Sequence, residues 1–223
     1  MPRQNRYIIP GLPHHLFQRG NNKQNVFPEL KDKDFFVKEV KRQAEENNVR
    51  VGAYCLMTNH FHFLLFPDTK ESFIKFVKSV SQKHSQFFNR KYKRTGKVWE
   101  NRYKLNIVDP EACWVLARYI ERNPIRAGLI ERAEDYECSS ARVHLCGGID
   151  NLVTEDILKG KREEYIEFFH EKDADNEKEL CRIRDVIQQQ KAMGSKDFLE
   201  KLQEQFGVDF NTRMRGRPRK SGK

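Results

Sequence analysis

Residues 49–66 read VRVGAYCLM-TN-HFHFLLF, and this stretch decides the fold. Two apolar runs are separated only by the dipeptide Thr58-Asn59. So short a break predicts two antiparallel strands, 49–57 and 60–66, joined by a tight hairpin, although the turn is not of the Asn-Gly type. The chain therefore contains at least one antiparallel pair, around which the neighbouring segments must pack.

The flanking segments extend this hairpin to the order βαββαβ, followed by a further helix. Residues 14–19 have strand character and end in a Gly-Asn-Asn turn. Helical spacing of apolar residues predicts helices over 31–47 and 71–92, and β-branched and aromatic residues predict a strand over 98–108. Asp109-Pro110-Glu111 signals a helix that runs to about residue 122. The simplest packing is an α+β fold, a ferredoxin-like (RRM-like) antiparallel sheet with helices on one face and the other face left for a ligand.

Length and composition divide the chain into three parts. Residues 1–148 hold the sheet, and 149–210 form a charged helical extension with helices expected at 154–170, 175–192 and 195–206. The formal charge is +10 at pH 7, and six positive charges without an acid lie in residues 213–223, so 211–223 form a basic tail. An excess of positive charge makes nucleic acid the first partner to test.

The cysteines and the hydropathy pattern exclude several classes of protein. Five scattered cysteines without a CxxC pair suggest neither a disulfide framework nor a zinc ribbon. The N-terminus lacks the apolar core of a secretory signal, and no apolar run is long enough to span a bilayer. We therefore expect a cytoplasmic protein with no membrane partner.

Two pairs of residues are candidates for chemistry. His60 and His62 are two apart on a predicted strand, so both imidazoles share one face, which is a spacing that suits a divalent metal given a further ligand. Two ordinary sheet histidines explain the same spacing equally well. Tyr119 lies on the apolar stripe of the last predicted helix, where core packing is the plain explanation. Asn123 follows four residues later, which places its amide oxygen near the tyrosine hydroxyl if the helix persists.

Four stretches together resemble a known family. They are HHLFQRGNN at 14–22, YCLMTNHFH at 54–62, GKVWENRY at 96–103 and YIERNPIRAGL at 119–129. In this order they resemble the REP-associated tyrosine transposases, which belong to the single-tyrosine HUH superfamily of IS200-like transposases, over about residues 10–145. The resemblance implies that Tyr119 attacks a phosphodiester of single-stranded, hairpin-bearing DNA such as a REP palindrome, forming a 5′-phosphotyrosine and later rejoining strands. It also implies that His60, His62 and Asn123 hold Mg or Mn, without any nucleotide cofactor.

Further positions are candidates for DNA contact, each beside a simpler explanation. Arg19, Asn21 and Asn22 match the family's Arg-Gly-Asn stretch but equally form a plain turn. Trp99, Arg102 and Lys104 interleave aromatic and basic side chains, as single-strand binding requires, although Trp99 is as easily a core residue. Arg126 is either a phosphate contact or a helix-end cation. Arg215, Arg217 and Arg219 resemble an AT-hook, with a disordered solubilising tail as the alternative.

Two other function classes stay open. A catalytically silent DNA-binding module of the same fold, acting as a repressor or architectural factor, would retain the sheet without the chemistry. A metal-dependent hydrolase rests on the His-x-His spacing alone. The leading interpretation is a nucleoid-associated transposase and nickase that is either a monomer or a homodimer, and covalent capture of DNA separates it from both rivals.

Overall fold

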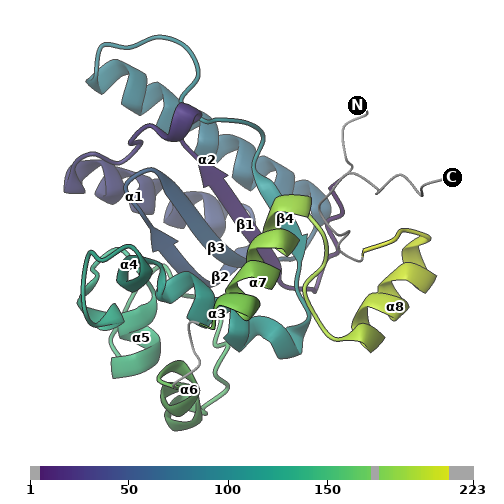
Figure 1. The fold of residues 1–223 in the computed structure, drawn as a ribbon. Helices are drawn as coiled ribbons and strands as arrows, with labels where there is room; N and C mark the ends of the chain where they lie inside the picture. Colours follow the sequence, from purple (N-terminus) through teal and green to yellow (C-terminus); the bar gives the residue numbers. More distant parts are fainter. Residues whose placement is uncertain (1–5, 172–175, 211–223) are drawn as a thin grey trace, which may run out of the picture.

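The computed structural model describes residues 6–171 and 176–210, and at its centre lies a four-stranded antiparallel sheet. The strands are β1 (His14–Arg19), β2 (Val49–Leu56), β3 (His60–Pro67) and β4 (Lys104–Ile107), in the order β2-β3-β1-β4 (Figure 1). The predicted hairpin is the β2-β3 pair, in which Cys55 lies opposite His62. The α+β fold and the ferredoxin-like sheet are confirmed.

Helices α1 (Leu30–Glu46) and α2 (Lys70–Lys91) cover one face of the sheet (Figure 1). Phe61 and Phe63 of β3 point into this layer and are almost fully buried there with Phe36 of α1. The Thr69 hydroxyl accepts a hydrogen bond from the Ser72 amide and so caps α2, which explains why that helix starts where it does. This side is the main aromatic core.

The other face of the sheet is covered as well, which corrects the expectation of helices on one face only. Helix α3 (Cys113–Glu121) packs on β2 and β3, and α7 (Glu177–Gln189) packs on β4, in front of which it lies in Figure 1. Ala53, Cys55 and Leu64 are apolar side chains on this face and are fully buried beneath α3. Apolar side chains on a sheet face must be buried against another element. In the sequence, the polar residues His60 and His62 on the same face indicated instead a face open to a ligand.

The predicted strand 98–108 is shorter in the structure than in the sequence analysis. Trp99 makes only an isolated bridge to Gly20, residues 101–103 leave the ladder, and β4 begins at Lys104. After β4, the Asp109 carboxylate accepts a hydrogen bond from the Glu111 amide, as predicted for a helix start. A single 3-10 turn, Pro110–Ala112, then leads into α3.

Besides α7 and the 3-10 turn Ala133–Asp135, the described chain beyond α3 contains four α-helices. They are α4 (Asn123–Arg126), α5 (Ala141–Cys146), α6 (Arg162–Phe169) and α8 (Lys196–Phe206). The predictions for 175–192 and 195–206 are confirmed by α7 and α8, the predicted helix 154–170 is present only from Arg162, and α5 was not predicted. No helix of the described residues has both the length and the apolar character needed to cross a membrane.

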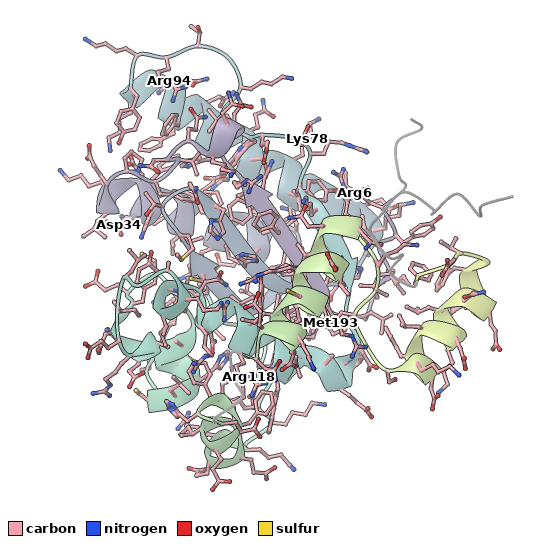
Figure 2. All side chains as sticks on the ribbon, in the orientation of Figure 1. Arg6, Asp34, Lys78, Arg94, Arg118 and Met193 are labelled. Carbon is pink, nitrogen blue, oxygen red and sulfur yellow. The ribbon has the colours of Figure 1, made fainter. Side chains whose placement is uncertain are left out.

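The extension is attached to the sheet and to α3 by hydrogen bonds. Just after α7, the Met193 amide donates to the Ile107 carbonyl at 2.8 Å, which adds a parallel bridge to the β4 edge; Met193 is labelled in Figure 2. At the C-terminal end of α3, the fully buried carboxylate of Glu121 accepts hydrogen bonds from the side chains of Ser140, His144 and Tyr165. The extension therefore packs against the same α3 helix that covers the sheet, with Tyr165 of α6 buried in the cluster that holds Leu116 of α3.

Candidate active site

The two predicted histidines lie side by side on β3, on the face covered by α3. Their ring centroids are 5.2 Å apart with the planes nearly perpendicular. In the antiparallel register, Arg19 of β1 lies opposite His60 and Phe17 lies opposite His62, so β1 forms one wall of the site. His62 is only 2% exposed, whereas His60 is partly exposed at the end of the strand.

Burial keeps both imidazoles neutral. Burial lowers the pKa of His60 to about 4, and the nearby charge of Arg19 adds to this effect. For His62, burial again lowers the pKa, to well below its ordinary value, with smaller contributions from His15 and His60. A neutral imidazole has one nitrogen lone pair available, which is the form that binds a metal.

Tyr119 faces the histidines from α3. Its ring meets that of His62 edge-on, with centroids 5.8 Å apart and an interplanar angle of 86°. The side chain is 9% exposed, and burial raises the pKa of its phenol, while the charges of Arg126 and Arg184 act in the opposite direction. The structure therefore brings Tyr119 next to His62, one of the two predicted histidines.

Two arginines flank the tyrosine. The Arg126 guanidinium carbon lies 4.7 Å from the centre of the Tyr119 ring, and its Nη2 also donates to the Tyr119 carbonyl. Arg184 reaches over from α7, hydrogen-bonds the phenol and pairs with Glu177 at 2.9 Å. Arg126 was expected as a DNA contact or a helix-end cation, and Arg184 was not predicted because the sequence does not show that α7 lies over α3.

Asn123 lies next to Tyr119, but its amide is turned differently from the prediction. Its Nδ2 donates to the backbone carbonyls of Tyr119 and Ile120, at 2.9 and 3.0 Å. The amide therefore holds the end of α3, and its Oδ1 points away from those carbonyls. No group of three or more His, Cys, Asp or Glu side chains in the described part of the chain could hold a metal, so a metal at His60 and His62 would require a ligand of another type, such as this amide oxygen.

A third histidine, which the sequence analysis did not assign, touches the pair. His15 of β1 is 1% exposed, and its Nε2 lies 2.9 Å from Nδ1 of His62, with the two rings stacked at 5.1 Å. The alternation of side chains along β1 could have placed it, because His15 and Phe17 share one face of that strand. Its own neighbour across the sheet is Asn106 of β4.

The remaining candidates for DNA contact lie in different environments. Arg19 is paired with Glu100 at 2.7 Å, and Asn21 and Asn22 form a short 3-10 turn at the end of β1. Arg102 is exposed on the loop before β4. Lys104 contacts Gln188 of α7 and lies 5.7 Å from the centre of the Phe17 ring, at the edge of the site.

Trp99 is a core residue, which corrects its assignment as a base-stacking side chain. Its indole nitrogen donates to the Ser81 carbonyl at 3.1 Å, and the ring packs edge-on against Phe61. A large aromatic ring beside an aromatic core is more stable buried than exposed. Arg215, Arg217 and Arg219 lie outside the described residues.

Comparison with known proteins places this site in a family. The family model described as "Transposase IS200 like" matches residues 10–123, which is more than half of the chain and includes both histidines, Tyr119 and Asn123. No curated protein matches the chain.

Two solved structures are similar. A REP-associated tyrosine transposase bound to a REP hairpin has 17% sequence identity and a TM-score of 0.54, over 70% of this chain and 93% of that one. A chain described as a transposase from Deinococcus radiodurans R1 has 19% identity and a TM-score of 0.38, over 55% of this chain and 97% of that one. At this sequence identity the similarity to the REP-associated tyrosine transposase establishes a shared fold only. The family assignment is based on the family model that matches residues 10–123. The chain belongs to the IS200-like transposase family.

Proposed function

We propose that this protein is a metal-dependent DNA transposase and nickase that cleaves and rejoins single-stranded DNA through Tyr119. The observation that carries the proposal is the meeting of Tyr119 on α3 with His62 on β3, edge-on in a buried site flanked by Arg126 and Arg184. A tyrosine that only packed in the core would not need two cations beside its ring and phenol.

The proposed reaction exchanges one ester for another. The phenolic oxygen of Tyr119 attacks the phosphorus of a phosphodiester, forms the 5′-phosphotyrosyl bond and loses its proton, while the bond to the 3′ oxygen breaks and leaves a 3′-hydroxyl. The reverse attack by a 3′-hydroxyl rejoins strands, so the cycle needs no nucleotide cofactor. Burial raises the pKa of the Tyr119 phenol and disfavours the phenolate. The charges of Arg126 and Arg184 oppose this shift and so favour the phenolate that attacks.

His60, His62 and the amide oxygen of Asn123 are the residues proposed to hold a divalent ion, Mg or Mn. The two imidazoles are neutral and on one face, which fits metal ligation. A bound divalent ion supplies Lewis-acid polarisation of a phosphate oxygen. Two imidazoles and one amide leave further ligand positions for phosphate or water.

A DNA hairpin is the proposed substrate. Its support is the resemblance to the REP-associated tyrosine transposases together with the similar structure that is bound to a REP hairpin. Arg102 is proposed to contact phosphate from its exposed loop, and Arg19, Asn21 and Asn22 are proposed to do so from the end of β1, beside His60. The tail arginines 215, 217 and 219 are proposed as an additional DNA contact.

The test is covalent capture. The full chain is incubated with 5′- and 3′-labelled single-stranded hairpins and Mn or Mg, and a denaturing gel is examined for a slower band that protease removes. We expect this band with wild type, its loss with Tyr119→Phe, and its retention with Tyr92→Phe, a control at the end of α2 that removes another phenol. Hairpin binding should survive in both variants.

Two results would contradict the proposal. An adduct that persists in Tyr119→Phe would place the nucleophile elsewhere. Tight hairpin binding by wild type without any adduct in Mn or Mg would favour the alternative of a DNA-binding repressor or architectural module built on the same fold.

A further inference from the structure

A chain of polar side chains runs from His62 across the sheet to the end of α7. His15 Nε2 lies 2.9 Å from His62 Nδ1, and Asn106 of β4 lies opposite His15 in the β1-β4 register. The Asn106 Nδ2 donates to the carbonyls of Val186 and Lys191, each at 2.8 Å. All three side chains of this relay, His62, His15 and Asn106, are at most 2% exposed.

The orientation of the Asn106 amide is determined by its two carbonyl partners. A carbonyl oxygen only accepts hydrogen bonds, so the atom that faces Val186 and Lys191 must be the amide nitrogen. The Oδ1 of Asn106 is then directed to the opposite side, toward His15. Among the described residues, Asn106 Oδ1 and His15 Nδ1 are both buried atoms without a hydrogen-bond partner of normal geometry. One can only accept and the other can donate, so these two neighbours in the β1-β4 register complement each other.

The positions of the protons follow from this orientation. Asn106 Oδ1 only accepts, so the pairing of these two atoms places the His15 proton on Nδ1. A neutral imidazole has a single ring proton, which leaves His15 Nε2 as an acceptor. His62 Nδ1 must then carry a proton to make the 2.9 Å hydrogen bond, and the lone pair of His62 is left on Nε2.

The other histidine of the pair is held in the same way. The Asn59 Nδ2 donates to the Lys23 carbonyl at 3.2 Å, which directs the Asn59 Oδ1 to His60 Nδ1 at 2.6 Å. His60 Nδ1 therefore carries the proton, and its lone pair is also on Nε2. Two asparagine amides, each oriented by backbone carbonyls, thus set the same tautomer on both rings.

We propose that Asn106 and His15 are positioning residues that hold His62 in the tautomer whose Nε2 can bind the metal. The backbone carbonyls at the end of α7 fix the orientation of the Asn106 amide. The inference rests on the proposed function insofar as it assigns His60 and His62 as ligands. Outer hydrogen bonds that orient ligating histidines commonly change metal affinity about 10–100-fold when removed. The relay also gives the helical extension a role in the site.

The first measurement reads the tautomer directly and needs neither metal nor activity. Full-length protein labelled with ¹⁵N-histidine is studied without metal by two-bond ¹H–¹⁵N correlation, with signals assigned by single histidine substitutions. We expect His60 and His62 to be protonated at Nδ1 and bare at Nε2. A proton on Nε2 of His62 in the wild-type protein would overturn the proposal.

The second measurement is the affinity for Mn²⁺, followed by the electron paramagnetic resonance signal of the free ion. Asn106→Leu and His15→Phe should each raise the dissociation constant about tenfold or more, because His62 loses its fixed acceptor. His84→Phe is the matched control, since it replaces another fully buried histidine, on α2, that does not touch His62. Its affinity for Mn²⁺ should equal that of wild type.

The outcomes separate this inference from the proposed function. If His62→Ala abolishes Mn²⁺ binding while Asn106→Leu and His15→Phe bind within twofold of wild type, the relay is refuted and the metal site stands. If His62→Ala leaves Mn²⁺ binding unchanged, the metal assignment fails, and the ¹⁵N tautomer of His62 alone decides the inference. His15→Phe preserves the ring stacked on His62, so the relay remains testable if Asn106→Leu does not fold.

Discussion

Replacing Glu121 with alanine should strongly destabilise the protein, because this carboxylate joins α3 to the chain that follows it. Glu121 is fully buried and accepts hydrogen bonds from Ser140 Oγ at 2.6 Å, His144 Nδ1 at 2.6 Å and the Tyr165 hydroxyl at 2.8 Å. Its removal leaves the buried donors of His144 and Tyr165 without this partner, while the Ser140 hydroxyl keeps only the Tyr54 carbonyl, at 3.3 Å. Breaking a buried, hydrogen-bonded charge in this way costs about 3–5 kcal/mol.

Urea unfolding followed by circular dichroism measures this loss. With an m-value of about 3 kcal/mol/M, the urea midpoint of Glu121→Ala should fall by roughly 1–2 M. Tyr165→Phe removes one of the three donors and should lower the stability by about 1.5–3 kcal/mol. Glu179→Ala on α7 is the control, since this carboxylate is 39% exposed and lies 3.5 Å from Arg118, so its loss should lower the stability by less than about 1 kcal/mol.

One result would refute the reasoning. If Glu121→Ala lost no more stability than Glu179→Ala, the three hydrogen bonds would not join α3 to the chain that follows it, and the buried carboxylate would have to be satisfied in some other way.

Four further predictions concern pH, packing, DNA and metal. Burial lowers the pKa of His84 to about 4, so below about pH 6.5 the unfolded chain binds a proton that the native state does not bind. The stability should therefore decrease as the pH falls, by up to about 1.4 kcal/mol per pH unit at this site. Urea midpoints at pH 7, 6 and 5 should fall less steeply for His84→Gln than for wild type, whereas parallel curves would contradict the assignment. Trp99→Phe loses the hydrogen bond to Ser81 and should lower the stability by about 0.5–1.5 kcal/mol, while its hairpin affinity in a gel-shift assay stays within about twofold of wild type. A large loss of affinity at unchanged stability would show that Trp99 stacks on a base after all. Arg102→Gln should weaken hairpin binding and reduce the slope of log affinity against log salt by about one, and an unchanged slope would remove Arg102 from the DNA contacts. EDTA should stop adduct formation while circular dichroism and hairpin binding stay unchanged, with activity restored by Mn or Mg; an adduct that forms in EDTA would exclude a required metal.

The sheet could be predicted from the sequence because its signals are local. Two apolar runs in residues 49–66, separated only by Thr58-Asn59, predict the β2-β3 hairpin, and Asp109 with Pro110 marks a helix start that the structure confirms. The weaker predictions have local causes too. The six-residue helix α5 is too short to show a helical period, and residues 101–103 leave the ladder although the stretch 98–108 that contains them holds β-branched and aromatic residues.

The site was only partly predictable, because its contacts join distant parts of the chain. The position of Tyr119 beside His62 came from a family resemblance, since neither spacing nor composition relates two residues so far apart in sequence. Arg184 and Asn106 belong to elements whose contact, α7 on β4, has no sequence signal of its own. The second covered face follows from the same long-range packing.

The contacts of Asn106 with Val186 and Lys191 have a consequence for how such a chain can evolve. Both partners are backbone carbonyls, so any residues that form a helix ending at this place can hold the amide equally well. Selection on this relay would act on the length and position of α7 and leave its side chains largely free to drift. An extension whose helix position alone is constrained can diverge in sequence until no motif remains. The family model ends at residue 123, well before α7 begins, which agrees with such divergence.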